Sequence, residues 1–305
     1  MIAFLFSGQG AQKVGMGKEL FDQSPAVRQV FECVSDAIGQ DMKKLCFEAS
    51  EAELNQTINT QPAVFTMDCA MAAALQEKGI APKACAGFSL GEYAALVCAG
   101  VVSLDAAACL IQARAQAMSR VQSGGMAAVL GMTAEEVEAA CAEVTNGYII
   151  PVNYNCPGQV VVAGDLDALD ELGKRLKEKK KRMMPLKVSG AFHSKYMEPA
   201  ADELEGILKQ TDFRVPTMPI ICNVTAEQPN ADENWIEMLK KQCCSPVRWE
   251  QSVRKLLTLG VDAFVECGPG KVLMGLNKKI CPDVPTFHVE DAASLQACIE
   301  GVQKG

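Results

Sequence analysis

The stretch from Ala84 to Gly100 constrains the fold most, because it predicts a buried strand, a sharp turn and a helix in immediate succession. Ala84–Gly87 is a run of small apolar residues typical of a buried strand, and the helical pattern that follows ends at Gly100. Between them, Gly87-Phe-Ser-Leu-Gly91 has the form G-x-S-x-G, which in a strand-to-helix turn presents the serine as a nucleophile. The sequence therefore predicts an α/β protein and makes Ser89 a candidate nucleophile. A serine in an ordinary glycine-flanked turn is the alternative.

The middle of the chain predicts a small domain inserted into a larger one. Its strands and helices alternate in the order βαββαβ, which is typical of a ferredoxin-like domain. They are expected at residues 126–132, 133–144, 148–154, 159–164, 165–180 and 182–188. Glycines at both ends, in Gly124-Gly125 and Ser189-Gly190, set the expected boundaries. We therefore expect an inserted domain at 124–188 and a large domain made of 1–123 and 189–305.

Other local signals predict further elements of the large domain. Apolar runs without alternation predict strands covered on both faces at 2–6, 219–224 and 263–267. Ser24-Pro25 predicts the start of a helix that ends at Gly39, and a second helix is expected from after Pro62 to about Lys78.

Composition excludes several classes of protein. The net charge of −8 argues against nucleic acid as the main partner. There is neither a basic leader nor an apolar run long enough to span a bilayer, so we expect a cytoplasmic protein without membrane contact. The 14 cysteines are scattered without C-x-x-C and only two histidines are present, so no metal site is expected and the cysteines are interpreted as small core residues. Lys13 and Met16 break the two nucleotide-binding motifs that begin near the N-terminus.

Arg114 lies on the apolar face of a predicted helix that begins after Ser103. That face continues from Ile111 to Met118, and Arg114 occupies a position where an apolar residue is expected. A buried guanidinium needs an anion, and no acidic residue lies one helical turn away on either side. The counter-ion would come from elsewhere in the fold or from a ligand. The alternative is an arginine whose charged end reaches past an apolar rim into solvent.

Two further segments have less specific signals. His193 follows the second glycine boundary in a predicted loop, which is a common place for a cleft, whereas His288 lies in a strand-like run and is interpreted as structural. The basic run Lys177–Arg182 ends the second helix of the small domain. Because cations suit a helix C-terminus, it is expected to be solvated, with a docking patch for an acidic partner as the alternative.

The chain resembles the malonyl-CoA:acyl-carrier-protein transacylases of fatty-acid synthesis and the acyltransferase domains of polyketide synthases. The resemblance covers nearly the whole chain and depends on ordered motifs. These are Gly8-Gln-Gly-Ala-Gln12, Thr60-Gln-Pro-Ala63, Gly87-Phe-Ser-Leu-Gly-Glu-Tyr93, Arg114, Val152-Asn-Tyr-Asn-Cys-Pro-Gly-Gln-Val160, Ala191-Phe-His193, Pro246-Val-Arg-Trp249 and Glu266-Cys-Gly-Pro-Gly-Lys271. It implies an α/β-hydrolase-like large domain with a ferredoxin-like insertion.

The resemblance also implies a role for individual residues. Ser89 would accept the malonyl group and His193 would be its general base, oriented by a backbone carbonyl near Pro246–Trp249 instead of by a carboxylate. The N–H groups of Gln9 and Leu90 would form the oxyanion hole. At the substrate, Arg114 would pair with the malonyl carboxylate, and Gln61 and Phe192 would line the binding site. Family members usually have histidine where this chain has Phe88, so the cleft beside the serine is expected to differ.

The implied reaction is transfer of malonyl from malonyl-CoA to the phosphopantetheine thiol of acyl carrier protein, with no cofactor and no metal, by an expected monomer. A serine hydrolase and a non-catalytic binding protein are the alternatives. Arg114 argues against a simple esterase, and the presence of both Ser89 and His193 argues against loss of catalysis. The same residues also serve polyketide systems, and a chain of 305 residues favours fatty-acid synthesis.

Overall fold

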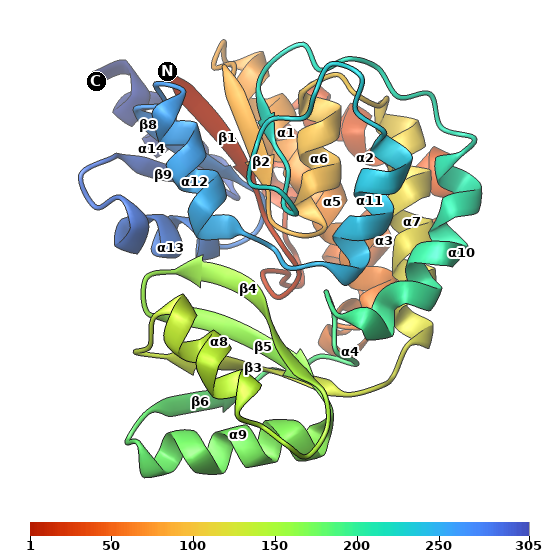
Figure 1. Ribbon diagram of the computed structural model, residues 1–305. Helices are drawn as coiled ribbons and strands as arrows, with labels where there is room; N and C mark the ends of the chain where they lie inside the picture. Colours follow the sequence, from red (N-terminus) through yellow and green to blue (C-terminus); the bar gives the residue numbers. More distant parts are fainter. Residues whose placement is uncertain (305) are drawn as a thin grey trace.

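The structure, a computed structural model that describes residues 1–304, contains two separate β-sheets (Figure 1). The strands are β1 (Ile2–Phe6), β2 (Ala84–Gly87), β3 (Gly125–Leu130), β4 (Ile149–Cys156), β5 (Gln159–Gly164), β6 (Arg182–Pro185), β7 (Ile220–Ile221), β8 (Ala263–Cys267) and β9 (Thr286–Val289). The larger sheet is parallel, with the order β7-β2-β1-β8-β9, and the smaller is antiparallel, with the order β4-β5-β3-β6. The protein is therefore of mixed α/β class.

Helices cover both faces of the parallel sheet. The helices of this part of the molecule are α1 (Lys18–Gln23), α2 (Pro25–Ile38), α3 (Met42–Phe47), α4 (Glu51–Leu54), α5 (Thr57–Glu77), α6 (Gly91–Cys98), α7 (Leu104–Arg120), α10 (Glu198–Leu208), α11 (Trp235–Cys244), α12 (Trp249–Thr258), α13 (Val272–Ile280) and α14 (Ala292–Lys304). Side chains alternate along β1: Phe4 and Phe6 pack in the core shared with α2, α5 and α7, and Ala3 and Leu5 pack in the core shared with α12 and α13. This two-sided burial explains why the strands of this sheet are apolar without alternation.

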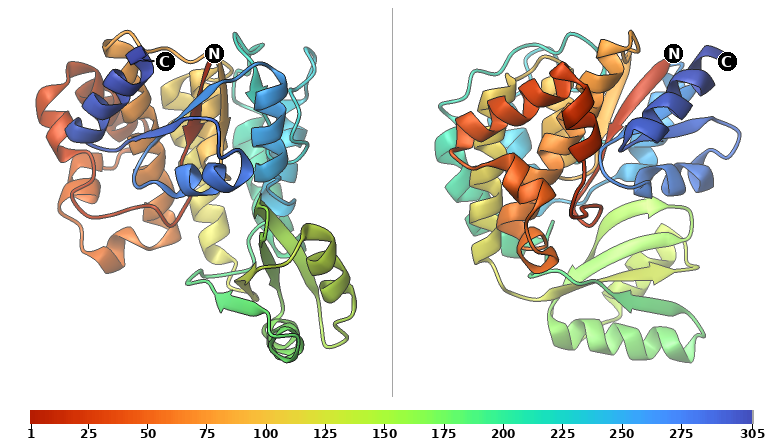
Figure 2. Two further views of the ribbon diagram at one scale, coloured as in Figure 1. Left: turned by 90° about the vertical axis from the view of Figure 1, so that its left-hand side faces the viewer. Right: turned by 180° about the vertical axis from the view of Figure 1, so that it is seen from behind.

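The antiparallel sheet lies at one end of the molecule with two helices, α8 (Ala134–Ala142) and α9 (Leu166–Glu178), packed on one face (Figures 1 and 2). Its other face contributes Met126 and Val161 to a cluster with Met118 of α7 and with Phe192. The cluster joins the antiparallel sheet to the helices of the parallel part, and Phe192 also lines the cavity described below.

Most predicted elements are confirmed, and the local end signals act as expected. The Ser24 hydroxyl accepts from the Val27 N–H at the start of α2, and Gly39 ends that helix with φ 65°. Thr133 and Glu136 form a reciprocal capping box at α8. Every helix within residues 1–304 is too short or too polar to cross a bilayer.

Three predicted elements have a boundary that was wrong by three residues or more. Helix α5 begins at Thr57 and contains Pro62, although proline removes a backbone donor from the helix. Strand β7 is limited to Ile220–Ile221, because the chain then turns so that the Asn223 side chain hydrogen-bonds to the backbone around Ser89. Strand β6 ends at Pro185, short of the predicted residue 188.

Candidate active site

Ser89 lies in a sharp turn between β2 and α6, with a left-handed backbone of φ 54°. Glycine is required on both sides of it. A Cβ on Gly87 would come within 2.0 Å of the Gly91 backbone, and a Cβ on Gly91 would come within 2.4 Å of the Phe6 carbonyl oxygen. The turn is therefore packed against β1, and its serine lies at the carboxyl end of the parallel sheet.

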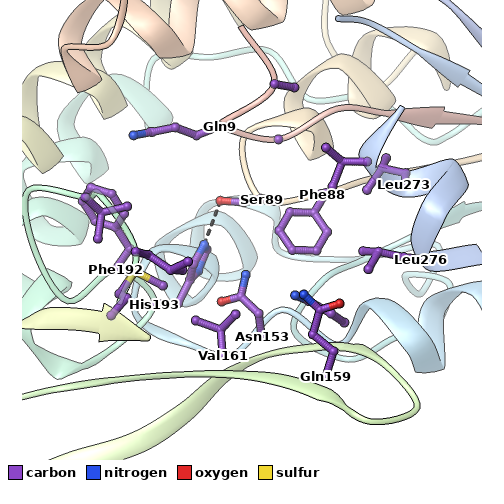
Figure 3. A pocket seen from close by; sticks show the side chains of 17 residues that line it. Gln9, Phe88, Ser89, Asn153, Gln159, Val161, Phe192, His193, Leu273 and Leu276 are labelled. Carbon is purple, nitrogen blue, oxygen red and sulfur yellow. Dashed lines mark hydrogen bonds between the residues drawn. The ribbon is translucent and has the colours of Figure 1, made fainter. Parts of the chain in front are cut away.

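The His193 imidazole faces Ser89, with Nε2 2.7 Å from the Ser89 Oγ (Figure 3). Its Nδ1 lies 3.0 Å from the carbonyl oxygen of Gln242. Because a carbonyl can only accept, Nδ1 donates the proton and Nε2 can accept from the serine hydroxyl. Burial, and then the positive charge of Arg114, lowers the pKa of His193 to about 4, so the ring is neutral at pH 7 and able to accept a proton.

Arg114 is buried, with 1% of its surface exposed, and reaches the serine from α7. Its guanidinium donates to the Gln61 Oε1 at 2.7 Å, the Gln242 Oε1 at 3.1 Å and the Ser89 Oγ at 3.1 Å. All three acceptors are neutral oxygens, and its Nε has no hydrogen-bond partner among the described residues. The group is thus a desolvated cation with unused capacity for an anion beside the reactive hydroxyl.

The backbone N–H groups of Gln9 and Leu90 donate no hydrogen bond to any residue that the structure describes. Gln9 lies in the turn after β1, and Leu90 precedes the first turn of α6. Figure 3 shows Gln9 on the side of Ser89 opposite Asn153. Both donors are therefore free for a group that binds at Ser89.

A cavity of about 210 Å³ opens beside Ser89, between the two sheets. Phe88, Leu273 and Phe192 form apolar walls, and Asn153 and Asn155 of β4 add amide groups. Both asparagines are less than a tenth exposed, and their Oδ1 atoms lack a partner among the described residues. Two amide side chains, each with a buried and unpaired oxygen, therefore border a largely apolar cavity.

Phe88 occupies the position where histidine was expected from the resemblance. Its ring packs on Trp249 with centroids 5.5 Å apart, and a Cβ on Gly8 would come within 2.8 Å of the ring. The aromatic ring thus fills the space between the glycine turn after β1 and α12, and makes this side of the cavity apolar.

The sequence analysis missed three residues beneath the turn. Asn223 accepts from the Ser89 N–H at 2.7 Å, and the Gln242 side chain donates to the Ser89 carbonyl at 2.6 Å and to Glu92 at 3.1 Å. The one signal in the local sequence was Glu92 itself, a charged residue directly after Gly91 at the start of a helix that is otherwise apolar. The backbone carbonyl that accepts from His193 belongs to Gln242, near the segment Pro246–Trp249 where it was expected.

Neither the other histidine nor any cysteine lines this cavity. His288 lies in β9 with its Nε2 3.9 Å from Glu290, and all 14 cysteines are unpaired. Among residues 1–304, no three His, Cys, Asp or Glu side chains are grouped to hold a metal ion.

Comparisons with known proteins agree over nearly the full length. The family model of the acyl transferase domain matches residues 3–291. The malonyl CoA-acyl carrier protein transacylase of Bacillus subtilis is 40% identical over 309 residues, 99% of this chain and 98% of that protein. The crystal structure of the Clostridium perfringens malonyl CoA-acyl carrier protein transacylase matches with a TM-score of 0.97 and 39% identity, over 99% of this chain and 97% of that one. A malonyl-transacylase solved in complex with its type II PKS acyl-carrier protein matches with a TM-score of 0.93 and 38% identity, over 98% and 99% of the two chains.

Proposed function

The chain belongs to the acyl transferase domain family, and from that membership we propose that it transfers malonyl from malonyl-CoA to the phosphopantetheine thiol of acyl carrier protein, supplying extender units for fatty-acid synthesis. The observation that carries the choice of substrate is the buried Arg114 guanidinium 3.1 Å from the Ser89 Oγ. The groups that accept from Arg114 are all neutral, and a malonyl carboxylate would supply an anion in direct contact with it, with two parallel hydrogen bonds.

In the first half-reaction, the Ser89 Oγ attacks the thioester carbonyl while His193 Nε2 takes the hydroxyl proton. The carbonyl oxygen becomes an oxyanion, and the free N–H groups of Gln9 and Leu90 would receive it. The C–S bond then breaks and His193 returns the proton to the departing coenzyme A thiolate. The product is malonyl-Ser89 with a neutral imidazole.

In the second half-reaction, the carrier thiol gives its proton to His193 and its sulfur attacks the malonyl ester. The C–O bond to Ser89 breaks, and the serine oxygen regains the proton. Because an acyl group only moves between two thiols, no oxidation state changes and no redox cofactor is required. Gln61 would hold Arg114 through its 2.7 Å hydrogen bond, and Phe192 would border the acyl group.

The cavity also suits the arm that both thiol substrates share. A pantetheine arm contains two amide groups on an otherwise narrow, largely apolar chain. Asn153 and Asn155 line the cavity with amide side chains, which would hydrogen-bond to those groups, and Phe88 and Leu273 add apolar surface to the same lining. The same channel would therefore serve coenzyme A and the carrier in turn.

We propose an α/β-hydrolase-like large domain of residues 1–123 and 189–305 with a ferredoxin-like insertion at 124–188. The β2–Ser89–α6 turn and the βαββαβ element order support these assignments. All the site residues come from one chain, so we propose that a monomer suffices. The 14 unpaired cysteines favour a cytoplasmic, reducing compartment.

Intact-protein mass spectrometry tests the function directly. Mixed with malonyl-CoA, the wild type should gain a malonyl group that holo acyl carrier protein removes, and Ser89→Ala should gain none. A malonyl adduct that decays equally fast without the carrier would instead indicate a hydrolase. Absence of any adduct on a folded wild type would indicate a binding protein.

A further inference from the structure

Glu92 is a fully buried carboxylate directly beneath the reactive turn. Its two oxygens bind two segments that are distant in sequence. Oε1 accepts from the Asn223 backbone N–H at 3.2 Å, and Oε2 accepts from the Gln242 Nε2 at 3.1 Å, across separations of 131 and 150 residues. Both neighbours are donors, so the site between them requires a group that accepts on both sides.

The two partners of Glu92 both hold the reactive serine. Asn223 accepts from the Ser89 N–H and donates to the Gly87 carbonyl at 2.6 Å, so it fixes the backbone on either side of the turn. Gln242 donates to the Ser89 carbonyl and accepts from His193 at its own backbone carbonyl. Glu92 therefore connects to every part of the Ser–His arrangement through one intermediate residue.

The Gln242 side-chain amide has only one useful orientation. Its NH₂ group faces the Ser89 carbonyl and Glu92, and its oxygen faces the Arg114 guanidinium. Turned over, the amide would place its NH₂ group against a cation and its oxygen against two other acceptors. An ionised Glu92 strongly favours the observed orientation, and that orientation gives Arg114 one of its three oxygen acceptors.

We propose that Glu92 is a positioning residue for carboxylate recognition: it holds the Gln242 amide so that the Arg114 guanidinium is presented to the free carboxylate of the acyl donor. The proposal depends on the proposed malonyl transfer and adds a residue that sets its selectivity. Glu92 also provides a negative charge near Arg114 in the same buried network, linked to it through the Gln242 amide.

The protonation state of Glu92 gives this role a measurable signature. The charged and titratable groups that face it are Arg114 of α7, Cys222 after β7, Cys243 of α11 and Tyr93 of α6. Burial raises the pKa of Glu92 to about 7, against the opposing effect of its hydrogen bonds and of Arg114. Above this pH the carboxylate accepts from both donors, and as the pH falls through it, protonation removes one acceptor.

His193 provides an internal reference for that measurement. Its lowered pKa leaves the imidazole neutral throughout the range in which Glu92 titrates. Acetyl-CoA needs His193 but has no carboxylate for Arg114. We therefore expect the wild-type ratio of kcat/KM for malonyl-CoA to kcat/KM for acetyl-CoA to decrease as the pH is lowered from about 8 to about 6. A constant ratio would overturn the proposal.

Glu92→Gln supplies the second test, because a carboxamide offers one acceptor where two donors face it. We expect its malonyl kcat/KM to fall about 10-fold or more, chiefly through KM, with a smaller loss for acetyl-CoA and no pH dependence of the ratio near 7. Glu266→Gln is a matched control, since burial also raises the pKa of Glu266 to about 7 but its oxygens accept from Leu273 and Met274 at the start of α13. An unchanged ratio in folded Glu92→Gln would contradict the role. Absence of malonyl-serine on the wild type would contradict the proposed function instead.

Discussion

The two sheets of this protein differ most in what lies buried beside them. Around the parallel sheet, Glu92, Arg114, Asp68, Glu266 and His193 are all less than a tenth exposed. In the described structure of residues 124–188, the buried polar side chains are Asn153 and Asn155, both facing the cavity. The core beneath α8 and α9 is otherwise mainly aliphatic, and its ion pairs, such as Arg175 with Glu171, lie at the surface.

This difference indicates which part of the molecule supplies the reactive groups and which part shapes the cavity. Burying a charge is unfavourable unless other groups compensate it, so the parallel part carries the reactive groups within a network of hydrogen bonds. The antiparallel part needs only to supply a wall and an entrance. Changes in the parallel part should therefore alter chemistry, whereas changes in the antiparallel part should alter which molecules reach it.

His193→Ala should have the largest effect. It removes the base from the parallel part and should slow formation of the acyl-enzyme by ~10²–10⁴-fold, measured by rapid quench and mass spectrometry. His288→Ala is the control, because the only other histidine lies in β9 and away from the cavity. Equal rates for His193→Ala and the wild type would show that His193 does not act as the base for Ser89.

Arg114→Ala should change selectivity. Loss of a desolvated pair with the malonyl carboxylate should reduce malonyl relative to acetyl transfer by ~2–5 kcal/mol, and Arg114→Lys should also be impaired because an ammonium cannot donate two parallel hydrogen bonds. Arg120→Ala, at the exposed end of the same helix, should leave the ratio unchanged. Equal losses with both thioesters would indicate that Arg114 only supports the fold.

Phe192→Ser tests the boundary between the two parts, since this ring lines the cavity from the cluster that joins them. If the ring occupies the space beside the malonyl α-carbon, its removal should reduce the preference for malonyl-CoA over methylmalonyl-CoA. One methyl group in an apolar pocket accounts for ~1–3 kcal/mol of such a preference. The measurement is kcat/KM for both thioesters. A ratio that stays the same in folded protein would show that Phe192 only shields the cleft.

Charge reversal in the antiparallel part should have the smallest effect. A groove lined by Lys177, Lys181 and Arg182 adjoins the reactive cavity, and both are lined by Met126 and Leu186. Lys181→Glu with Arg182→Glu should raise KM for an acidic carrier a few-fold at low salt and leave acylation by malonyl-CoA unchanged. Lys83→Glu, before β2 and at the opposite end of that strand from Ser89, is the control. An unchanged KM would favour the interpretation of this run as a solvated helix end.

Local signals predicted much of the fold, because they act within a few residues. The cap at Ser24, the capping box at Thr133 and the glycines around Ser89 each determine structure from adjacent sequence. The limits of β7 and the role of Gln242 were missed, because both depend on contacts made across more than 130 residues. Arg114 was found because a charge on an apolar stripe is visible locally, whereas its partner Gln242 carries no such signal.

The left-handed backbone of the reacting pair has a consequence for folding. Of the four non-glycine residues with positive φ in residues 1–304, two are Ser89 and His193, at 54° and 60°. A side chain in this conformation costs ~1–2 kcal/mol, which the surrounding contacts must offset. Glycine avoids this steric cost, and the saving outweighs the larger chain entropy that glycine loses on folding. The free energy of unfolding of Ser89→Gly should therefore exceed that of Ser89→Ala by about 1 kcal/mol, seen as unfolding at a higher denaturant concentration. The inactive glycine variant would then be the more durable of the two proteins, and thermodynamic robustness and nucleophilicity would be competing demands on a single residue.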